Sequence, residues 1–465
     1  MRDKELIDLG LRRGGGIENA RRSIQRAVHA GLSKKQVRRL LKDVARDPAA
    51  FLGDPHFAEL ARALQADHAA EAAITRRTGH APFRQWGENL DPKSLDQMYN
   101  ACALPVSVRG ALMPDAHVGY GLPIGGVLAT HKAVIPYAVG VDIACRMKLT
   151  ALDLPAATLD DAPERLKKAI EQETKFGVGA CFKNRRDHPV MDRDWTVSPV
   201  TLRLKDKAWS QLGTSGSGNH FVEFGELEIL EDGLALPRGR YLALLTHSGS
   251  RGTGAEVCGY YSRIAMDKRR DMPRESKHLA WLDLDSQAGG EYWAAMELMG
   301  AYAAANHECI HRHIARNLGA AVLLDIENHH NFAWREIHDG MDLVVHRKGA
   351  TPAAEGQLGI IPGSMASPAY IVRGRGSAAS LDSASHGAGR VMSRSEAKKR
   401  FTWGEARRVL EARRVTLISA GLDEVPMVYK DIDEVMAAQA DLVEALARFQ
   451  PRIVKMAPSG ERPED

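Results

Sequence analysis

The chain has 465 residues, of which 44% are hydrophobic and 26% charged, a composition typical of soluble globular proteins. No run of about 18 apolar residues predicts a membrane span, and the charged N-terminus lacks the apolar segment of a signal peptide. Five scattered cysteines without a CxxC pair argue against a disulfide framework, so we expect a cytoplasmic protein without membrane partners.

The net charge of +4 is unevenly distributed, because residues 1–80 carry 16 Lys and Arg against 10 Asp and Glu. This basic segment suits an anionic partner such as nucleic acid, or it is only a solvated helix face. Ser33 is a plausible N-cap for a helix over Lys34–Arg46, and a further helix is expected near Pro55. We therefore expect a small helical N-terminal extension over residues 1–80 and a separate, larger domain over residues 81–465.

Beyond residue 83 glycine becomes frequent, and helical and strand-like segments are mixed along the chain. This mixture predicts an α+β fold. The predicted helices are Asp91–Ala103, Asp160–Thr174, Glu291–Leu318 and Ile432–Leu446, and the predicted strands are Tyr241–Leu245, Ala321–Ile326 and a short Ile453–Val454.

An acid and a cysteine, Asp142 and Cys145, stand three residues apart in the apolar run GVDIACRM. A carboxylate and a thiolate at this spacing can both reach one metal ion, and a thiolate can bridge two. The alternative is a buried free cysteine beside a turn-forming aspartate. Other ligand-rich segments later in the chain favour the metal site.

Histidines stand at strand starts or ends in three of these segments: His220 in GSGNHFVE, His247 in THSGSRGTG, and His329 or His330 in ENHHN. A neutral imidazole is the commonest protein ligand for metals. One such histidine is usually structural, but three along one chain favour a shared metal site. Arg251, which follows His247, supplies a guanidinium suited to phosphate.

His386 lies among small residues in the segment SHGAGRVMSR, where its ring can stand exposed on a loop. An imidazole nitrogen can attack phosphorus and form a covalent phosphoramidate. Arg390 and Arg394 follow at i, i+4 spacing and suit anionic oxygens. Asp115 and His117, in a segment rich in Gly and Pro, remain open between a functional role and an ordinary turn.

The segment His307–His311 matches the HExxH pattern of zinc peptidases on a predicted helix. This short pattern also occurs by chance, and the helix lies between the other ligand-rich segments. A packed helix with partly buried histidines is the favoured interpretation.

Together, the sets GVDIACRM, GSGNHFVE, THSGSRGTG, NHHN, HRKGAT, PGSM, SHGAGRVMSR and DEVPMVYKDIDEV closely resemble the RtcB RNA-splicing ligases over residues 83–456. The resemblance implies that residues 81–465 form a catalytic domain with a single RtcB-like mixed α/β core, in which helices surround buried sheets. It also implies a ligase that depends on GTP and two Mn²⁺ ions. Its substrates would be RNA 3′-phosphate or 2′,3′-cyclic phosphate ends and RNA 5′-hydroxyl ends, in RNA repair or tRNA splicing. Archease is a possible accessory partner in this family.

The resemblance also implies roles for individual residues. One ion would be bound by Asp142, Cys145 and His220, and the other by Cys145, His247 and His330, so that the sulfur bridges them. His386 would carry GMP as a covalent intermediate. Asn219, Glu223, Ser364, Tyr429 and Lys455 would bind the nucleotide, and Arg251, Arg347, Arg390 and Arg394 would meet RNA or phosphate.

The chain departs from the family pattern at Arg146, Pro352 and Ala369, and Lys455 is followed by Met456 and a tail. With the basic N-terminal extension, these departures suggest a divergent paralogue and leave the nucleotide preference open. Two other functions remain: a metal-dependent phosphatase or cyclic phosphodiesterase acting on RNA ends without ligation, and a non-catalytic protein that binds RNA ends.

Overall fold

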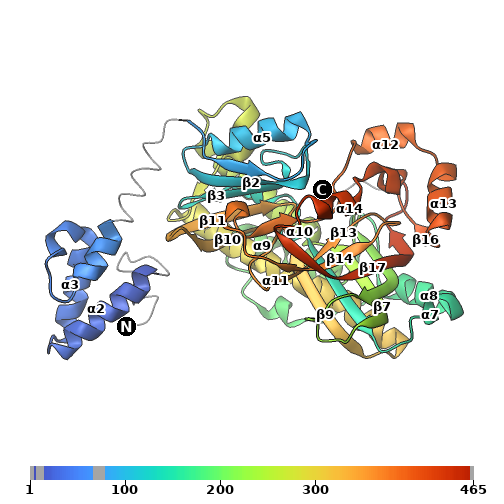
Figure 1. Cartoon of the computed structure of the whole chain (residues 1–465), viewed down its shortest axis with the longest axis horizontal. Coiled ribbons are helices and arrows are strands. Elements are labelled where there is room, and N and C mark those ends of the chain that lie inside the picture. Colours follow the sequence, from blue (N-terminus) through green and yellow to red (C-terminus); the bar gives the residue numbers. More distant parts are fainter. Residues whose placement is uncertain (1–4, 7–14, 66–78, 461–465) are drawn as a thin grey trace.

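The structure, a computed structural model, describes residues 5–6, 15–65 and 79–460. Helices α2 (Gly15–His29) and α3 (Lys34–Arg46), with η1 (Pro48–Phe51), lie together near the N-terminus (Figure 1). They bury a hydrophobic cluster drawn wholly from residues 6–64. Ser33 accepts a hydrogen bond from the backbone N–H of Gln36 and forms a capping box with it, which confirms the predicted start of α3. The predicted domain boundary near residue 80 adjoins residues 66–78, which lie outside the described residues.

The larger of the two main sheets curls into a nearly closed, barrel-like form. Its strand order is β13–β14–β17–β6–β7–β5–β9, with β16 paired to β17. Asn328 on β9 accepts from the backbone N–H of Ile360 on β13 at 3.0 Å, so a side chain joins the two ends of the sheet. The strands are β5 (Arg146–Leu152), β6 (Phe221–Ile229), β7 (Gly239–Ser248), β9 (Val322–His329), β13 (Leu358–Pro362), β14 (Ala369–Gly374), β16 (Thr416–Ser419) and β17 (Val443–Met456).

The second sheet has the order β1–β2–β3–β11–β10. It consists of β1 (Phe83–Gln85), β2 (Ser107–His117), β3 (Ile124–Thr130), β11 (Met341–Lys348) and β10 (Asn331–His338). Two short pairs complete the strands: β4 (Ala133–Val134) with β8 (Leu282–Asp283), and β12 (Ala350–Pro352) with β15 (Ser383–Ser385).

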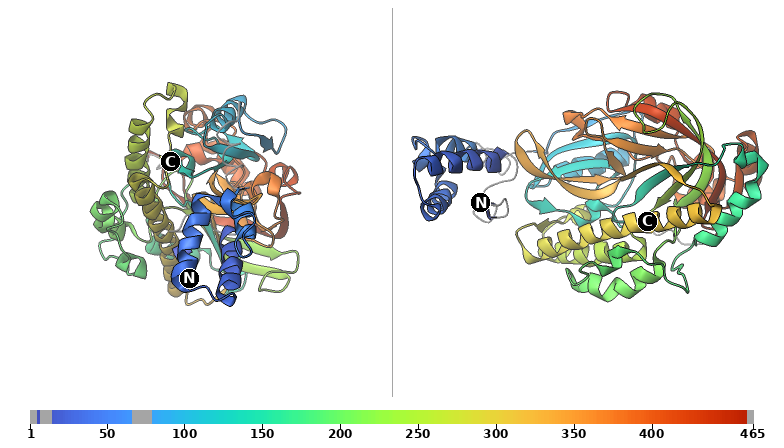
Figure 2. Two further views of the ribbon diagram at one scale, coloured as in Figure 1. Left: turned by 90° about the vertical axis from the view of Figure 1, so that its left-hand side faces the viewer. Right: turned by 90° about the horizontal axis from the view of Figure 1, so that it is seen from below.

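The long helix α11 (Gln287–Leu318) covers the outer face of the larger sheet, as Figure 2 shows. Its Ile310 and Ile314 pack with Leu244 of β7 in one buried cluster. Within residues 5–6, 15–65 and 79–460, no helix is both long and apolar enough to cross a bilayer. The other α-helices within residues 79–460 are α5 (Pro92–Cys102), α6 (Pro136–Val139), α7 (Thr158–Asp161), α8 (Pro163–Glu173), α9 (Pro199–Gln211), α10 (Arg251–Lys268), α12 (Arg394–Arg400), α13 (Trp403–Ala412) and α14 (Ile432–Ala437).

The predicted α+β fold is confirmed, but the helix predicted over Ile432–Leu446 is wrong beyond its first turns. Helix α14 ends at Ala437, and β17 begins at Val443. The segment is rich in helix formers, yet it pairs with β6 on one side and β14 on the other. Pairing on both edges outweighs local helix propensity, and it extends the predicted short strand to 14 residues.

The antiparallel pairing in the larger sheet brings four distant segments to one edge. Strand β5 pairs with both β7 and β9, so Arg146 at its start lies opposite Ser248 and His329. Strand β6 pairs with β7, so Phe221 lies opposite His247. The residues just before β5 and β6 therefore meet the residues at the ends of β7 and β9.

Candidate active site

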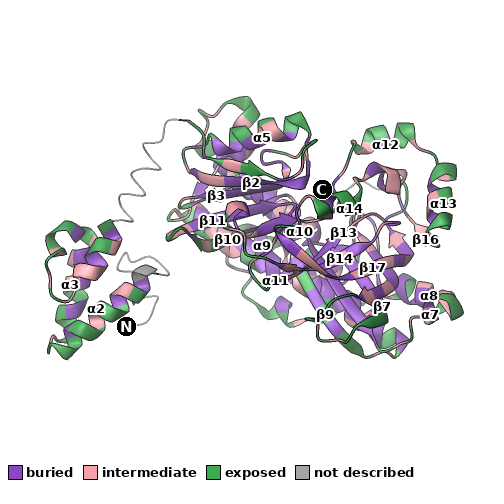
Figure 3. Cartoon of the chain, in the orientation of Figure 1, coloured by how far each residue is buried: buried purple, intermediate pink, exposed green. Residues whose placement is uncertain are grey.

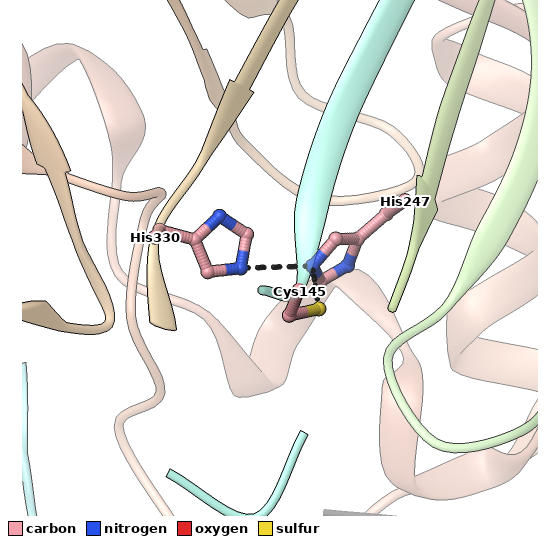
Figure 4. Close-up of side chains that lie close together, drawn as sticks. All are labelled: Cys145, His247 and His330. Carbon is pink, nitrogen blue, oxygen red and sulfur yellow. Dashed lines mark hydrogen bonds between the residues drawn. The ribbon is translucent and has the colours of Figure 1, made fainter. Parts of the chain in front are cut away.

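Three of the predicted ligands, Cys145, His247 and His330, meet at this edge (Figure 4). His247 Nε2 lies 3.1 Å from Cys145 Sγ and 3.2 Å from His330 Nε2. All three side chains are buried, and their ligand atoms lie within 4.8 Å of one another. The group has the donors and the spacing of a metal site.

Asp142, Cys145 and His220 form a second group with the same spacing, and Cys145 belongs to both. His220 Nε2 lies 3.1 Å from Asp142 Oδ2 and 3.3 Å from Cys145 Sγ. The other carboxylate oxygen of Asp142 accepts from the backbone N–H of Ser250 at 3.0 Å. Gly249 makes this approach possible, because a Cβ there would lie 2.0 Å from Asp142 Oδ2.

The hydrogen bonds of the histidines determine which ring nitrogens can bind a metal. His247 Nδ1 donates to the carbonyl oxygen of Asn219 at 3.1 Å, so Nε2 of the neutral ring carries a lone pair. Burial lowers the pKa of His247 to about 3 and that of His330 well below 6.5. Both rings are therefore neutral at pH 7, the form that binds metal.

His220 is arranged differently, because the Arg251 guanidinium donates to its Nδ1 at 3.2 Å. The proton of the neutral ring then stands on Nε2, facing Asp142. Asp142 Oδ2 is buried and lies 3.1 Å from this nitrogen. A cation bound by His220 Nε2 and Asp142 Oδ2 would replace that proton, since metal binding to imidazole displaces it. The donor atoms therefore fit two cations that share one sulfur.

A cavity of about 880 Å³ opens over both groups and is large enough for a nucleotide. His386 lines it, and its ring centroid lies 4.9 Å from that of His330. His386 Nδ1 donates to Asp115 Oδ2 at 2.7 Å, and Asp115 is fully buried. This bond fixes the tautomer, leaving Nε2 of His386 as the unprotonated nitrogen. The sequence indicated Asp115 only as an open candidate.

Another wall of the cavity contains a compact charged cluster around the buried Glu424. Arg390 Nη1 lies 3.2 Å from Glu424 Oε2, and Arg394 and the Tyr429 hydroxyl also donate to this carboxylate. The Arg390 guanidinium lies 5.5 Å from the centre of the Tyr429 ring. The predicted Arg390, Arg394 and Tyr429 are thus brought together, and the sequence did not indicate that Glu424 holds them.

Asn219, Glu223 and Ser364 also line the cavity, and so does Ala369, one of the departures from the family pattern. Burial raises the pKa of the Glu223 carboxyl well above 4.5, which favours its protonated form. Ser364 Oγ lies 2.9 Å from Ser367 Oγ.

Three predicted site residues do not line this cavity. Arg251 is buried behind His220 and also donates to Ser248 Oγ. Arg347 is buried, with its guanidinium donating to Glu336, Ser383 and backbone carbonyls. Lys455 lies on the opposite face of β17 from the cavity, 3.7 Å from Glu171.

Lys348 lines the cavity although the sequence reasoning selected its neighbour Arg347. Its ammonium donates to the carbonyl oxygen of Tyr120 at 2.5 Å, and burial lowers its pKa to about 8. Strand alternation is the signal that could have found it, because neighbouring residues on β11 face opposite sides. His117 also lines the cavity and donates from Nδ1 to the Asp115 carbonyl at 3.1 Å.

The two histidines of the HExxH pattern do not form a metal site, because the Thr246 hydroxyl stands between them. Thr246 Oγ1 lies 2.7 Å from His307 Nδ1 and 2.8 Å from His311 Nε2. His307 Nε2 donates to the Ser248 carbonyl, and His311 Nδ1 accepts from Thr150. This hydrogen-bonded chain, the α11 relay, attaches α11 to the strand that carries His247. The favoured interpretation as a packed helix is confirmed.

Arg146, beside the shared sulfur, turns away from the cavity. Its guanidinium donates to Glu327 at 3.0 Å and to the Gly300 carbonyl on α11 at 3.3 Å. The large side chain at this position therefore leaves the ligand groups open. Pro352, another departure, lies on the short strand β12.

Comparison with known proteins agrees with this geometry. The model of the family described as tRNA-splicing ligase RtcB matches residues 97–198 and 193–456. The chain belongs to the RtcB family. The RNA-splicing ligase RtcB1 of Escherichia coli is 34% identical over 400 residues, covering 79% of this chain and 96% of the relative. The tRNA-splicing ligase RtcB of Nanoarchaeum equitans is 32% identical over 435 residues, covering 78% and 91%, and the RNA-splicing ligase RtcB of Mycobacterium tuberculosis is 33% identical over 427 residues, covering 76% and 98%.

Proposed function

We propose that this RtcB-family protein is a GTP- and Mn²⁺-dependent RNA ligase. It joins RNA 3′-phosphate or 2′,3′-cyclic phosphate ends to 5′-hydroxyl ends. The observation that carries the proposal is that one cavity contains both the shared-sulfur ligand groups and His386. Family membership and the names of the relatives support RNA ends as the substrate.

In this proposal, Asp142, Cys145 and His220 hold one ion, and Cys145, His247 and His330 hold the other. Two ions there would neutralise charge on the phosphate oxygens during an in-line displacement. Mn²⁺ follows from the family resemblance, while the same Cys and His donors also suit Zn²⁺. Which of these ions the protein binds is therefore a separate measurement from the test of ligase activity.

His386 is the proposed nucleophile, and Asp115 positions it. With its Nδ1 proton held by Asp115, His386 Nε2 attacks the α-phosphorus of GTP. A nitrogen–phosphorus bond forms, the bond to pyrophosphate breaks, and pyrophosphate leaves with the electron pair. His386 then carries GMP.

The next two steps transfer this nucleotide to RNA and release it. An oxygen of the RNA 3′-phosphate attacks the phosphorus of the bound GMP, and the bond to His386 breaks. The RNA 5′-hydroxyl then attacks the activated 3′-phosphate, losing its proton as the phosphodiester forms and GMP leaves. A 2′,3′-cyclic end must first be opened by water to a 3′-phosphate.

The cavity walls provide the remaining proposed contacts. Asn219, Glu223, Ser364 and Tyr429 are proposed to contact the nucleotide. Arg390 and Arg394 are proposed to meet phosphate, in exchange for part of their contact with Glu424. Because Arg251, Arg347 and Lys455 do not line the cavity, we propose that the first two support the site from behind rather than touch substrate.

The test is transfer of label from GTP carrying a radioactive α-phosphate, in the presence of Mn²⁺. We expect covalent label in the wild-type chain and none in His386→Ala. His188→Ala is the matched control, because His188 lies away from the cavity and pairs with Glu308. A wild-type chain that takes no label, or a His386→Ala variant that takes it, contradicts the proposal. RNA-end phosphatase activity that persists at full rate in His386→Ala would favour the non-ligating alternative.

A further inference from the structure

Helix α3 presents a strongly basic face for which the N-terminal extension provides little counter-charge. Six of its 13 residues are basic and exposed, and Figure 3 shows exposed positions along this helix. Of these, Arg46 pairs with Asp43 at 3.1 Å. The other five have no carboxylate within ion-pair distance among the described residues; we call them the α3 basic face: Lys34, Lys35, Arg38, Arg39 and Lys42.

The α3 basic face destabilises the helix that carries it. Lys34 and Lys35 lie in the first turn, which contains no acidic residue, so their charges face the positive end of the helix dipole. Lys34, Arg38 and Lys42 follow one another at i, i+4 spacing, and like charges at that spacing repel. An external anion with repeated charges would relieve both effects.

The opposite side of α3 is already occupied, so the helix has no free apolar face to insert into a lipid surface. Val37, Leu41 and Val44 are buried in the cluster that also contains Phe57 and Leu60. A helix that lies on a membrane must insert its apolar face into the lipid. Here that face forms the core of the N-terminal extension, so only the charged face remains for a partner.

Two arginines on the neighbouring helix α2 pair with a glutamate, unlike the α3 basic face. Arg22 and Arg26 of α2 are both exposed, and both lie within ion-pair distance of Glu59. The extension therefore neutralises basic residues on α2 but leaves those on α3 open. The match to the family model begins at residue 97, so α3 lies outside the matched residues.

We propose that the α3 basic face binds the phosphate backbone of RNA, outside the active-site cavity. The choice of RNA as the polyanion rests on the proposed function, whereas the open positive charge is independent of it. Lysine and arginine contacts to phosphate depend on charge rather than on sequence, so this surface would hold many RNAs alike.

The experiment measures binding of the full-length chain to a fluorescent 40-nucleotide single-stranded RNA with 3′-hydroxyl ends, which the proposed reaction cannot activate. The test variant carries five substitutions: Lys34→Gln, Lys35→Gln, Arg38→Gln, Arg39→Gln and Lys42→Gln. The matched control removes five exposed charges that are paired with acids in the structure: Arg185→Gln, Arg203→Gln, Lys207→Gln, Arg238→Gln and Arg240→Gln.

Each phosphate contact contributes about 0.7 to the slope of log affinity against log salt for single strands. Loss of two contacts therefore weakens binding about 25-fold at 0.1 M salt, and loss of all five lowers the slope by about 3.5. We expect the test variant to fall in this range and the control to stay within about twofold of wild type. Equal binding by all three proteins, or equal loss in both variants, overturns the proposal.

Circular dichroism shows whether the test variant keeps its helices, as expected for substitutions confined to exposed side chains. Label transfer from GTP separates this inference from the proposed function. The test variant is expected to take label at the wild-type rate, whereas His386→Ala takes none but keeps its RNA affinity. If the wild-type chain took no label yet lost RNA affinity in the test variant, the proposed function would fail and the RNA-binding surface would stand.

Discussion

Replacing Thr246 with valine tests whether the α11 relay stabilises the strand that carries His247. The substitution keeps the shape of the side chain but removes the hydroxyl between His307 Nδ1 and His311 Nε2, at 2.7 and 2.8 Å. Both ring nitrogens would then be buried without a partner. Each such loss costs about 1–3 kcal/mol, so the free energy of unfolding should fall by about 2–6 kcal/mol.

The matched control is Thr246→Ser, which keeps the hydroxyl and loses one methyl group, at a cost of about 1 kcal/mol. Urea denaturation followed by tryptophan fluorescence compares the three proteins. Because Thr246 adjoins His247, the valine variant should also bind metal about 10- to 100-fold more weakly, as is usual when groups that orient a ligand are lost. A valine variant as stable as the serine variant would refute the relay as a stabilising element.

Three further predictions concern the cavity and the buried histidines. Asp115→Asn should slow label transfer to His386 by about 10²- to 10⁴-fold, measured with GTP labelled at the α-phosphate, while metal binding is unchanged. Burial lowers the pKa of His346 to about 4 from 6.5, so the unfolded chain binds the extra proton and stability falls as the pH drops below 6.5. This group should contribute a loss of about 2 kcal/mol in the free energy of unfolding by pH 5, and a denaturation series should show a flatter pH dependence for His346→Gln. Mn²⁺ at 100 times its dissociation constant should stabilise the chain by about 2.7 kcal/mol per site, measured as a rise in melting temperature. This rise should disappear on chelation and in Cys145→Ala. An equal rise in Cys145→Ala would mean that the metal binds elsewhere.

The ligand residues could be selected from the sequence because each lies beside a strand with a distinctive pattern. Their convergence could not be derived from the patterns alone. It depends on β5 pairing antiparallel with β7 and β9 and on β6 pairing with β7, and strand partners are not encoded locally. The family resemblance supplied the partition of the ligands into two sets.

Three predicted site residues lie outside the cavity: Arg251, Arg347 and Lys455. They show what reasoning from sequence motifs omits. A motif identifies neighbours in sequence, but a strand sends neighbours to opposite faces. On β17, Val454 and Met456 line the cavity, whereas Lys455 between them faces Glu171. On β11, Lys348 likewise lines the cavity, whereas its neighbour Arg347 faces the other side of the strand.

The error at the C-terminal end of α14 has a related cause. Residues after Ala437 have good helix propensity, but the larger sheet needs a strand between β6 and β14. Phe449 and Ala447 of β17 are buried in the interior of that sheet. Pairing with β6 and β14 therefore gives these residues a strand conformation. Neither of those strands adjoins β17 in the sequence.

The spread of the ligands along the chain has a consequence during synthesis. Cys145 leaves the ribosome long before His330, and at 5–20 residues per second the interval is about 10–40 s. During this interval, the thiol that is later buried at the edge of the larger sheet is open to oxidants and to any thiol-binding metal in the cell. Only when β9 docks beside β5 does the full set of donors exist. A metal bound by these donors would therefore be selected only at the end of folding, from the ions available at that stage.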